Sequence, residues 1–144
     1  MTIITANELL EEWQERLGLM DWCIVLRINV KQDDFEGEEP VVGQTNWQNT
    51  SKTAVIKVLD EKLYGDRIIA YDFERILVHE LLHIKFNILQ QDPFNHETTV
   101  FDEFQHQLIE DMAQALIMAK RGKTKRTDNL RVERVKDYSE EGEH

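Results

Sequence analysis

A chain of 144 residues, 41% hydrophobic and 31% charged, is typical of one globular domain that folds around its own core. The net charge is −11 overall and −12 for residues 1–120, which disfavours contact with a phosphate backbone and leaves nucleic-acid binding only to the basic part of the tail. No apolar stretch approaches the ~20 residues of a membrane span, and a single cysteine excludes an internal disulfide, so we expect a cytoplasmic protein without membrane contact.

The first predicted element is a helix over residues 6–17, because its apolar residues recur at helical spacing. Thr5 and Glu8 form a capping-box pattern at its start, and Gly18 supplies its end. The apolar positions are Leu9, Leu10, Trp13 and Leu17.

Three strands are predicted next, over residues 22–30, 41–48 and 53–59. The first alternates, with Trp22, Ile24, Leu26, Ile28 and Val30 on one side. Cys23 lies inside this run, and we expect it to be a small core residue. Residues 49–51 connect the second and third strands as a hairpin, so we expect a meander in which each strand pairs with the next.

Two helices are predicted in the second half of the chain. Asp72 caps a helix over residues 73–89, which Pro93 prevents from continuing. Thr99 begins a last helix over residues 100–120. Its apolar positions are Phe101, Phe104, Leu108, Ile109, Met112, Ala113, Leu116 and Ile117.

These elements predict an α+β fold for residues 1–120. It consists of an N-terminal helix, a small three-stranded sheet, an active-site helix and a closing C-terminal helix. Residues 121–144 are mostly charged or polar, and we expect them to form a flexible C-terminal tail.

The second-half helix at residues 73–89 contains a His-Glu-x-x-His motif formed by His79, Glu80 and His83. Positions i and i+4 share one helix face, so both imidazoles can reach one Zn²⁺. Glu80 is offset from that face and can take a proton from metal-bound water as general base. In a helix without metal the two histidines would be ordinary polar residues, but the apolar neighbours of this turn indicate burial, where polar groups need partners.

A catalytic zinc needs a third protein ligand, and the last helix offers His106 and Glu110 one turn apart. In the arrangement we favour, His106 is the ligand and Glu110 accepts a hydrogen bond from the outer nitrogen of a ligand histidine. The reverse assignment stays open, with Glu103 or His96 as further candidates, and we expect His144 to take no part.

Three motifs resemble one family of proteins. They are Leu9-x-x-x-Trp13-x-x-x-Leu17-Gly18-Leu19-x-x-Trp22, Ile76-Leu77-Val78-His79-Glu80-Leu81-Leu82-His83 and His106-x-x-x-Glu110-x-x-Ala113. Over residues 7–118 the chain resembles the compact zincins, especially small phage- and prophage-encoded metallopeptidases related to the SprT-like and ImmA/IrrE-like families, the latter minimal gluzincins.

The resemblance implies a zincin-like fold with one Zn²⁺ and a protein or peptide substrate. Gluzincins have a glutamate as third ligand with an acidic residue four positions later, so His106 departs from that pattern, although SprT-like proteins use a histidine there. The resemblance also implies that a strand at residues 41–48 or 53–59 pairs with an extended substrate. The sequence has no paired-cysteine zinc ribbon, which weakens a link to DNA.

We therefore expect a zinc-dependent metallopeptidase that hydrolyses peptide bonds with metal-activated water. The alternatives are a zincin-fold binding or regulatory module with structural zinc and little activity, and a DNA-associated SprT-like protease. Tyr64, Tyr71 and His96 are candidate oxyanion donors that the sequence does not rank. Trp47 could line the cleft or belong to the core.

Overall fold

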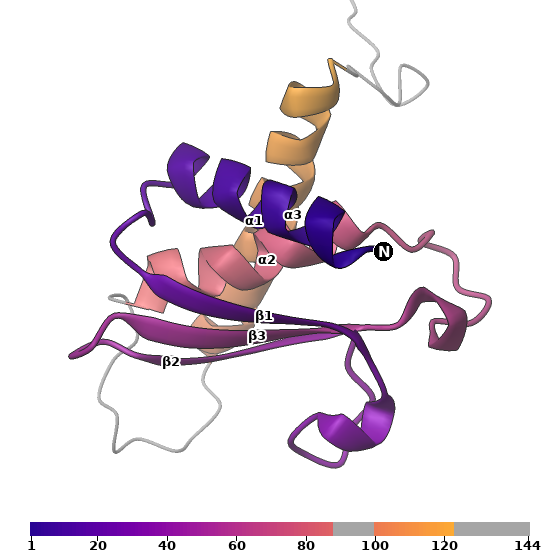
Figure 1. The fold of residues 1–144 in the computed structure, drawn as a ribbon. Helices are drawn as coiled ribbons and strands as arrows, with labels where there is room; N and C mark the ends of the chain where they lie inside the picture. The colour runs from indigo at the N-terminus through magenta and orange to yellow at the C-terminus, as the bar shows by residue number, and fades with distance from the viewer. Residues whose placement is uncertain (88–99, 123–144) are drawn as a thin grey trace, which may run out of the picture.

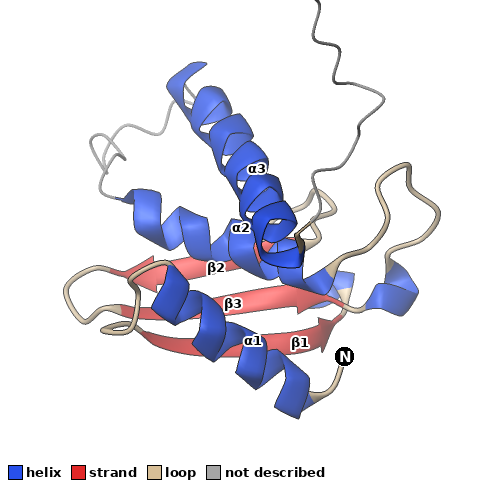
Figure 2. Cartoon of the chain, turned by 90° about the horizontal axis from the view of Figure 1, so that it is seen from above, coloured by secondary structure: helices blue, strands red, loops and turns tan. Residues whose placement is uncertain are grey.

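The computed structural model describes residues 1–87 and 100–122. In these ranges two helices lie on one face of a small mixed sheet and a third crosses the second, as Figures 1 and 2 show. The elements are α1 (Ile3–Arg16), β1 (Cys23–Val30), η1 (Gln32–Asp34), β2 (Gly43–Gln48), β3 (Thr53–Leu59), η2 (Glu61–Leu63), α2 (Phe73–Phe86) and α3 (Val100–Arg121), where η marks a 3-10 turn. The predicted α+β class is confirmed.

The strand order of the sheet is β1-β3-β2. β3 pairs antiparallel with β2, as expected of the hairpin, but it pairs parallel with β1. The predicted meander is therefore wrong. β3 is the most deeply buried strand and suits the centre of the sheet, whereas β1 and β2 expose alternate residues and suit the edges.

One face of the sheet carries the core and meets the helices. Leu26, Ile56 and Thr45 are in register across the three strands, so all three side chains point to this face. Trp47 lies two residues on from Thr45 and packs, half-buried, against the same core. The buried members of this core include Ala6, Leu10, Trp13, Ile56, Val58, Leu77, Leu81, Ile109 and Ala113.

Two predictions about the first quarter of the chain are wrong. α1 begins at Ile3 with Thr2 as its N-cap, and the Thr2 hydroxyl accepts from the Thr5 backbone, so Thr5 is not the cap. The apolar periodicity concealed this early start because Ile3 and Ile4 are exposed. Cys23 is exposed rather than in the core, since alternation along β1 places it opposite Ile24.

The later helices begin where the sequence predicted them, although α2 ends at Phe86 with Asn87 as its C-cap, before the predicted end at residue 89. The Asp72 carboxylate caps α2 by accepting a hydrogen bond from the Arg75 backbone N–H. Leu89, the predicted end of this helix, and Thr99, the predicted start of the last helix, lie outside the described residues. Two apolar residues of α3, Phe104 and Leu108, are exposed instead of inward-facing; the buried stripe is Ile109, Ala113 and Ile117. No helix in the described ranges combines the length and apolar character needed to cross a bilayer.

Candidate metal centre

α2 is the most buried helix of the molecule and carries the His-Glu-x-x-His motif. Its apolar residues pack on the sheet on one side and on α3 on the other. His79 is 9% exposed and Glu80 only 5%, whereas His83 is half-buried. The motif therefore lies inside the fold, where its polar atoms need defined partners.

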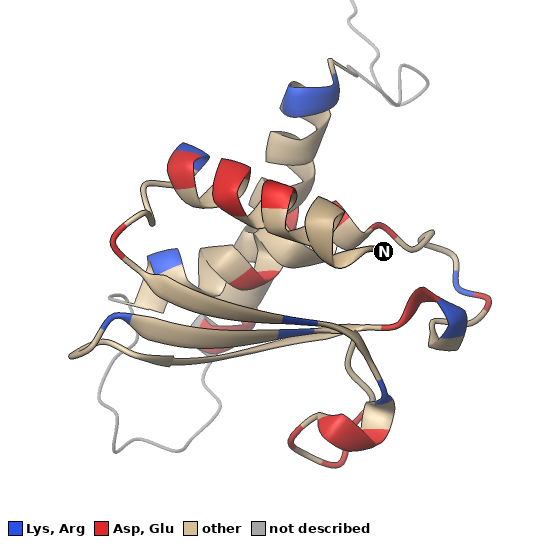
Figure 3. Ribbon diagram, viewed as in Figure 1, with Lys and Arg blue, Asp and Glu red and all other residues tan. Residues whose placement is uncertain are grey.

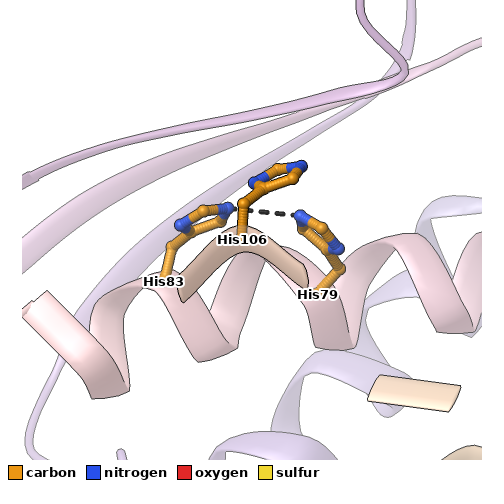
Figure 4. A group of neighbouring side chains, drawn as sticks. All are labelled: His79, His83 and His106. Atoms are coloured by element: carbon orange, nitrogen blue, oxygen red, sulfur yellow. Dashed lines mark hydrogen bonds between the residues drawn. The ribbon is translucent and has the colours of Figure 1, made fainter. Parts of the chain in front are cut away.

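α3 brings a third imidazole to this turn. The His106 ring centroid lies 5.0 Å from that of His79 and 5.5 Å from that of His83. One nitrogen from each of the three rings lies within 4.8 Å of the others, and Figure 4 shows the rings gathered at one point. His106 is the exposed member of the group, so it lies at the open side.

Glu110 connects His79 to an arginine that sequence reasoning missed. The His79 Nδ1 lies 2.5 Å from the Glu110 Oε2, and the other carboxylate oxygen accepts from the Arg75 guanidinium. Burial lowers the pKa of His79, and the Glu110 carboxylate offsets part of that effect. With Nδ1 donating to Glu110, the lone pair of neutral His79 is on Nε2. The position of Arg75, four residues before His79, was the signal that could have found it.

The nitrogens of the first two histidines are spaced as metal ligands would be. His79 Nε2 and His83 Nε2 are 3.2 Å apart. Two tetrahedral ligands at zinc–nitrogen distances of ~2.0–2.1 Å are separated by about 3.3 Å. Burial, together with His79 and His106, lowers the pKa of His83 to about 4, so His83 is neutral at pH 7 and offers a lone pair. This donor set suits Zn²⁺.

Glu80 is held by β2. The Thr45 hydroxyl donates to Glu80 Oε2 at 2.5 Å, and a Cβ at Gly43 would lie only 2.7 Å from Glu80 Oε1. Burial raises the pKa of Glu80 to about 7, although the Thr45 hydrogen bond opposes this. Sequence reasoning missed both β2 residues; the period-two alternation of the strand puts Gly43 and Thr45 on its inward face and could have revealed them.

A cavity of about 340 Å³ opens over these groups. It is lined by the apolar residues Pro40, Val41, Val42 and Ile76, by Gly43, by the site residues His79, Glu80, His106 and Glu110, and by Arg67 and Arg75. Two arginines and the carboxylate that holds His79 thus share one cavity with the imidazoles of His79 and His106.

Other candidates from the sequence lie elsewhere. The hydroxyls of Tyr64 and Tyr71 donate to backbone carbonyls of Ile69 and Leu59, and neither tyrosine lines the cavity. Glu103 is exposed on α3 and does not line it either. The two remaining histidines, His96 and His144, lie outside the described residues.

Comparison with protein-family models, curated proteins and solved structures found no match to this chain. The resemblance to compact zincins therefore stays a prediction. The proposal on function below therefore depends on the arrangement of His79, His83, His106 and Glu80.

Proposed function

We propose that the chain is a zinc-dependent metallopeptidase that hydrolyses peptide bonds with Glu80 as general base. The observation that carries this proposal is the convergence of His79, His83 and His106 beside a buried carboxylate at an open cavity. Three imidazoles with one coordination position left over are typical of catalytic rather than structural zinc.

Each residue of the site has a role in this proposal. His79, His83 and His106 would hold the ion, and Glu110 fixes the tautomer of His79. Zn²⁺ would supply Lewis acidity, which acidifies water and polarises a carbonyl.

Glu80 takes a proton from the attacking water and delivers it to the amine as the C–N bond breaks. The pKa of Glu80, raised to about 7 by burial, suits a group that both accepts and returns a proton near neutral pH. Thr45 fixes the position of the carboxylate through Oε2, and Glu80 lines the cavity.

The sheet supports an extended polypeptide as substrate. Of the two strands considered for substrate pairing, β3 is paired on both sides, whereas β2 has a neighbour on one side only among the described residues. β2 is also the strand that holds Glu80, so a peptide added along it would pass beside the base. We propose that this substrate is a protein or peptide in the cytoplasm.

The alternatives have less support. A structural zinc site is closed by four protein ligands, but the cluster found in the described ranges has three. A role at DNA would depend on the basic residues of the tail, because residues 1–120 carry a net charge of −12 that repels phosphate.

The test compares zinc-loaded wild type with Glu80→Gln on a peptide library, with cleavage read by mass spectrometry. We expect cleavage by the wild type and a loss of at least ~100-fold in Glu80→Gln at unchanged zinc content. Glu11→Gln, an exposed glutamate on α1, is the matched control. Cleavage by Glu80→Gln at the wild-type rate would contradict the assigned role.

A further inference from the structure

The cavity over the histidines contains a cation that the proposed reaction does not use. Arg67 and Arg75 both line it, together with Glu80 and Glu110. Arg75 forms an ion pair with Glu110, and Glu80 is bonded to Thr45. Arg67 forms no salt bridge with any described carboxylate.

Arg67 is held in place by a cation–π contact rather than by an ion pair with a described carboxylate. Its guanidinium carbon lies 4.7 Å from the ring centroid of Tyr64. That ring is buried, and its hydroxyl donates to the Ile69 carbonyl at 2.6 Å. Tyr64 also packs edge-on against Tyr71 at 5.4 Å, so the surface beneath Arg67 is fixed.

Arg67 is a positive charge in a chain that carries an excess of acidic residues. The chain carries 28 acidic and 17 basic residues, and Asp and Glu are spread over α1 and the η1 and η2 segments in Figure 3. A guanidinium pre-positioned by an aromatic ring, on a cavity wall shared with Pro40, Val41 and Val42, presents a fork suited to a planar carboxylate.

We propose that Arg67 recognises a carboxylate of the substrate, so that this site prefers peptides bearing a negative charge next to the bond that is cleaved. The inference rests on the proposed function, because it places that carboxylate beside the metal ligands. The carboxylate can belong to an acidic side chain or to the C-terminus of a peptide. The charge of Arg75 is compensated by Glu110, so among the described lining residues Arg67 is the cation left to meet the substrate.

Three short probes test this inference, each with a zinc-chelating hydroxamate at its N-terminal end. The first carries Glu and a C-terminal amide, the second Gln and an amide, and the third Gln and a free C-terminal carboxylate. Their affinities are measured by calorimetry on zinc-loaded wild type, on Arg67→Met and on Arg27→Met, an exposed arginine of β1 that does not line the cavity.

We expect at least one charged probe to bind wild type and Arg27→Met ~10-fold more tightly than the neutral probe, and Arg67→Met to lose that preference while keeping its affinity for the neutral probe. Preference for the first probe identifies a side chain, and preference for the third identifies a chain terminus. Equal affinities for all three probes in a zinc-loaded protein, or a preference that survives Arg67→Met, overturn this inference alone. A protein that binds neither zinc nor any probe overturns the proposed function as well.

Discussion

Gly43 and Thr45 confine the carboxylate of Glu80 from the strand side. Thr45 donates to Oε2, and Gly43 leaves just enough space for Oε1. The histidine spacing was readable in the sequence because it depends on helix geometry alone. The contribution of β2 was not identified, because it depends on which strand lies beside α2, and that is a property of the tertiary fold.

Gly43→Ala tests the confinement of Glu80. The new Cβ would lie 2.7 Å from Glu80 Oε1 and 2.9 Å from Ile76 Cγ2, so we expect a loss of ~1–3 kcal/mol in the free energy of unfolding, measured with urea. In a Glu80→Ala background the cost should be clearly smaller, because one of the two clashes is removed. An equal cost in both backgrounds would show that Glu80 is not the group being crowded.

Glu110→Gln tests the link between Glu110 and His79. The carboxylate raises the pKa of His79 against the larger effect of burial and orients its ring, so its replacement should weaken zinc binding ~10–100-fold in competition with a chelator. Asp111→Asn, at the exposed neighbouring position, should leave the affinity unchanged. The same affinity in wild type and Glu110→Gln would remove Glu110 from the site.

At the scale of elements, caps and apolar periodicity predicted the positions of the helices well, but they predicted the pairing of the strands less well. Asp72 and the apolar period located α2, and the range of β3 was predicted correctly. The position of β1 beside β3 depends on contacts across the sheet, which alternation does not specify. The exposure of Phe104 and Leu108 likewise depends on how α3 docks on α2.

The N-terminus of α2 provides a test that depends on pH. Burial raises the pKa of Asp72, but hydrogen bonds from Arg121 and from the Arg75 backbone outweigh it, so the pKa is below its ordinary value. The carboxylate therefore stabilises the fold above the unfolded-state pKa of ~3.9, and this contribution is lost as the pH falls through the lower folded-state pKa.

Asp72→Asn keeps a cap but removes the charge. It should be ~0.5–1 kcal/mol less stable than wild type at pH 7 and close to wild type near pH 2, by urea unfolding. Asp72→Ala, which also removes the cap, should lose ~1 kcal/mol more at pH 7. A difference between Asp72→Asn and wild type that is constant with pH would contradict the account.

At the scale of the whole molecule, the candidate site joins three elements that are distant in the sequence. α2 supplies two histidines and Glu80, α3 supplies His106 and Glu110, and β2 supplies the residues around Glu80. An unfolded chain lacks this arrangement, so a metal should bind the folded state preferentially.

Zinc should therefore stabilise the fold. Free Zn²⁺ at 100 times its Kd should add ~2.7 kcal/mol and raise the Tm, and a chelator should reverse the change. His106→Ala should show little of this increase, whereas Gln107→Ala, an exposed neighbour, should retain it. An identical Tm increase in His106→Ala would mean that zinc acts at another site.

Zinc stoichiometry tests the central claim most directly. After dialysis against buffer containing trace zinc, elemental analysis of the wild type should give about one ion per chain, and His79→Ala, His83→Ala and His106→Ala should each give far less while remaining folded by circular dichroism. A folded wild type without zinc, or a His106→Ala variant that retains a full equivalent, would contradict the three-histidine site.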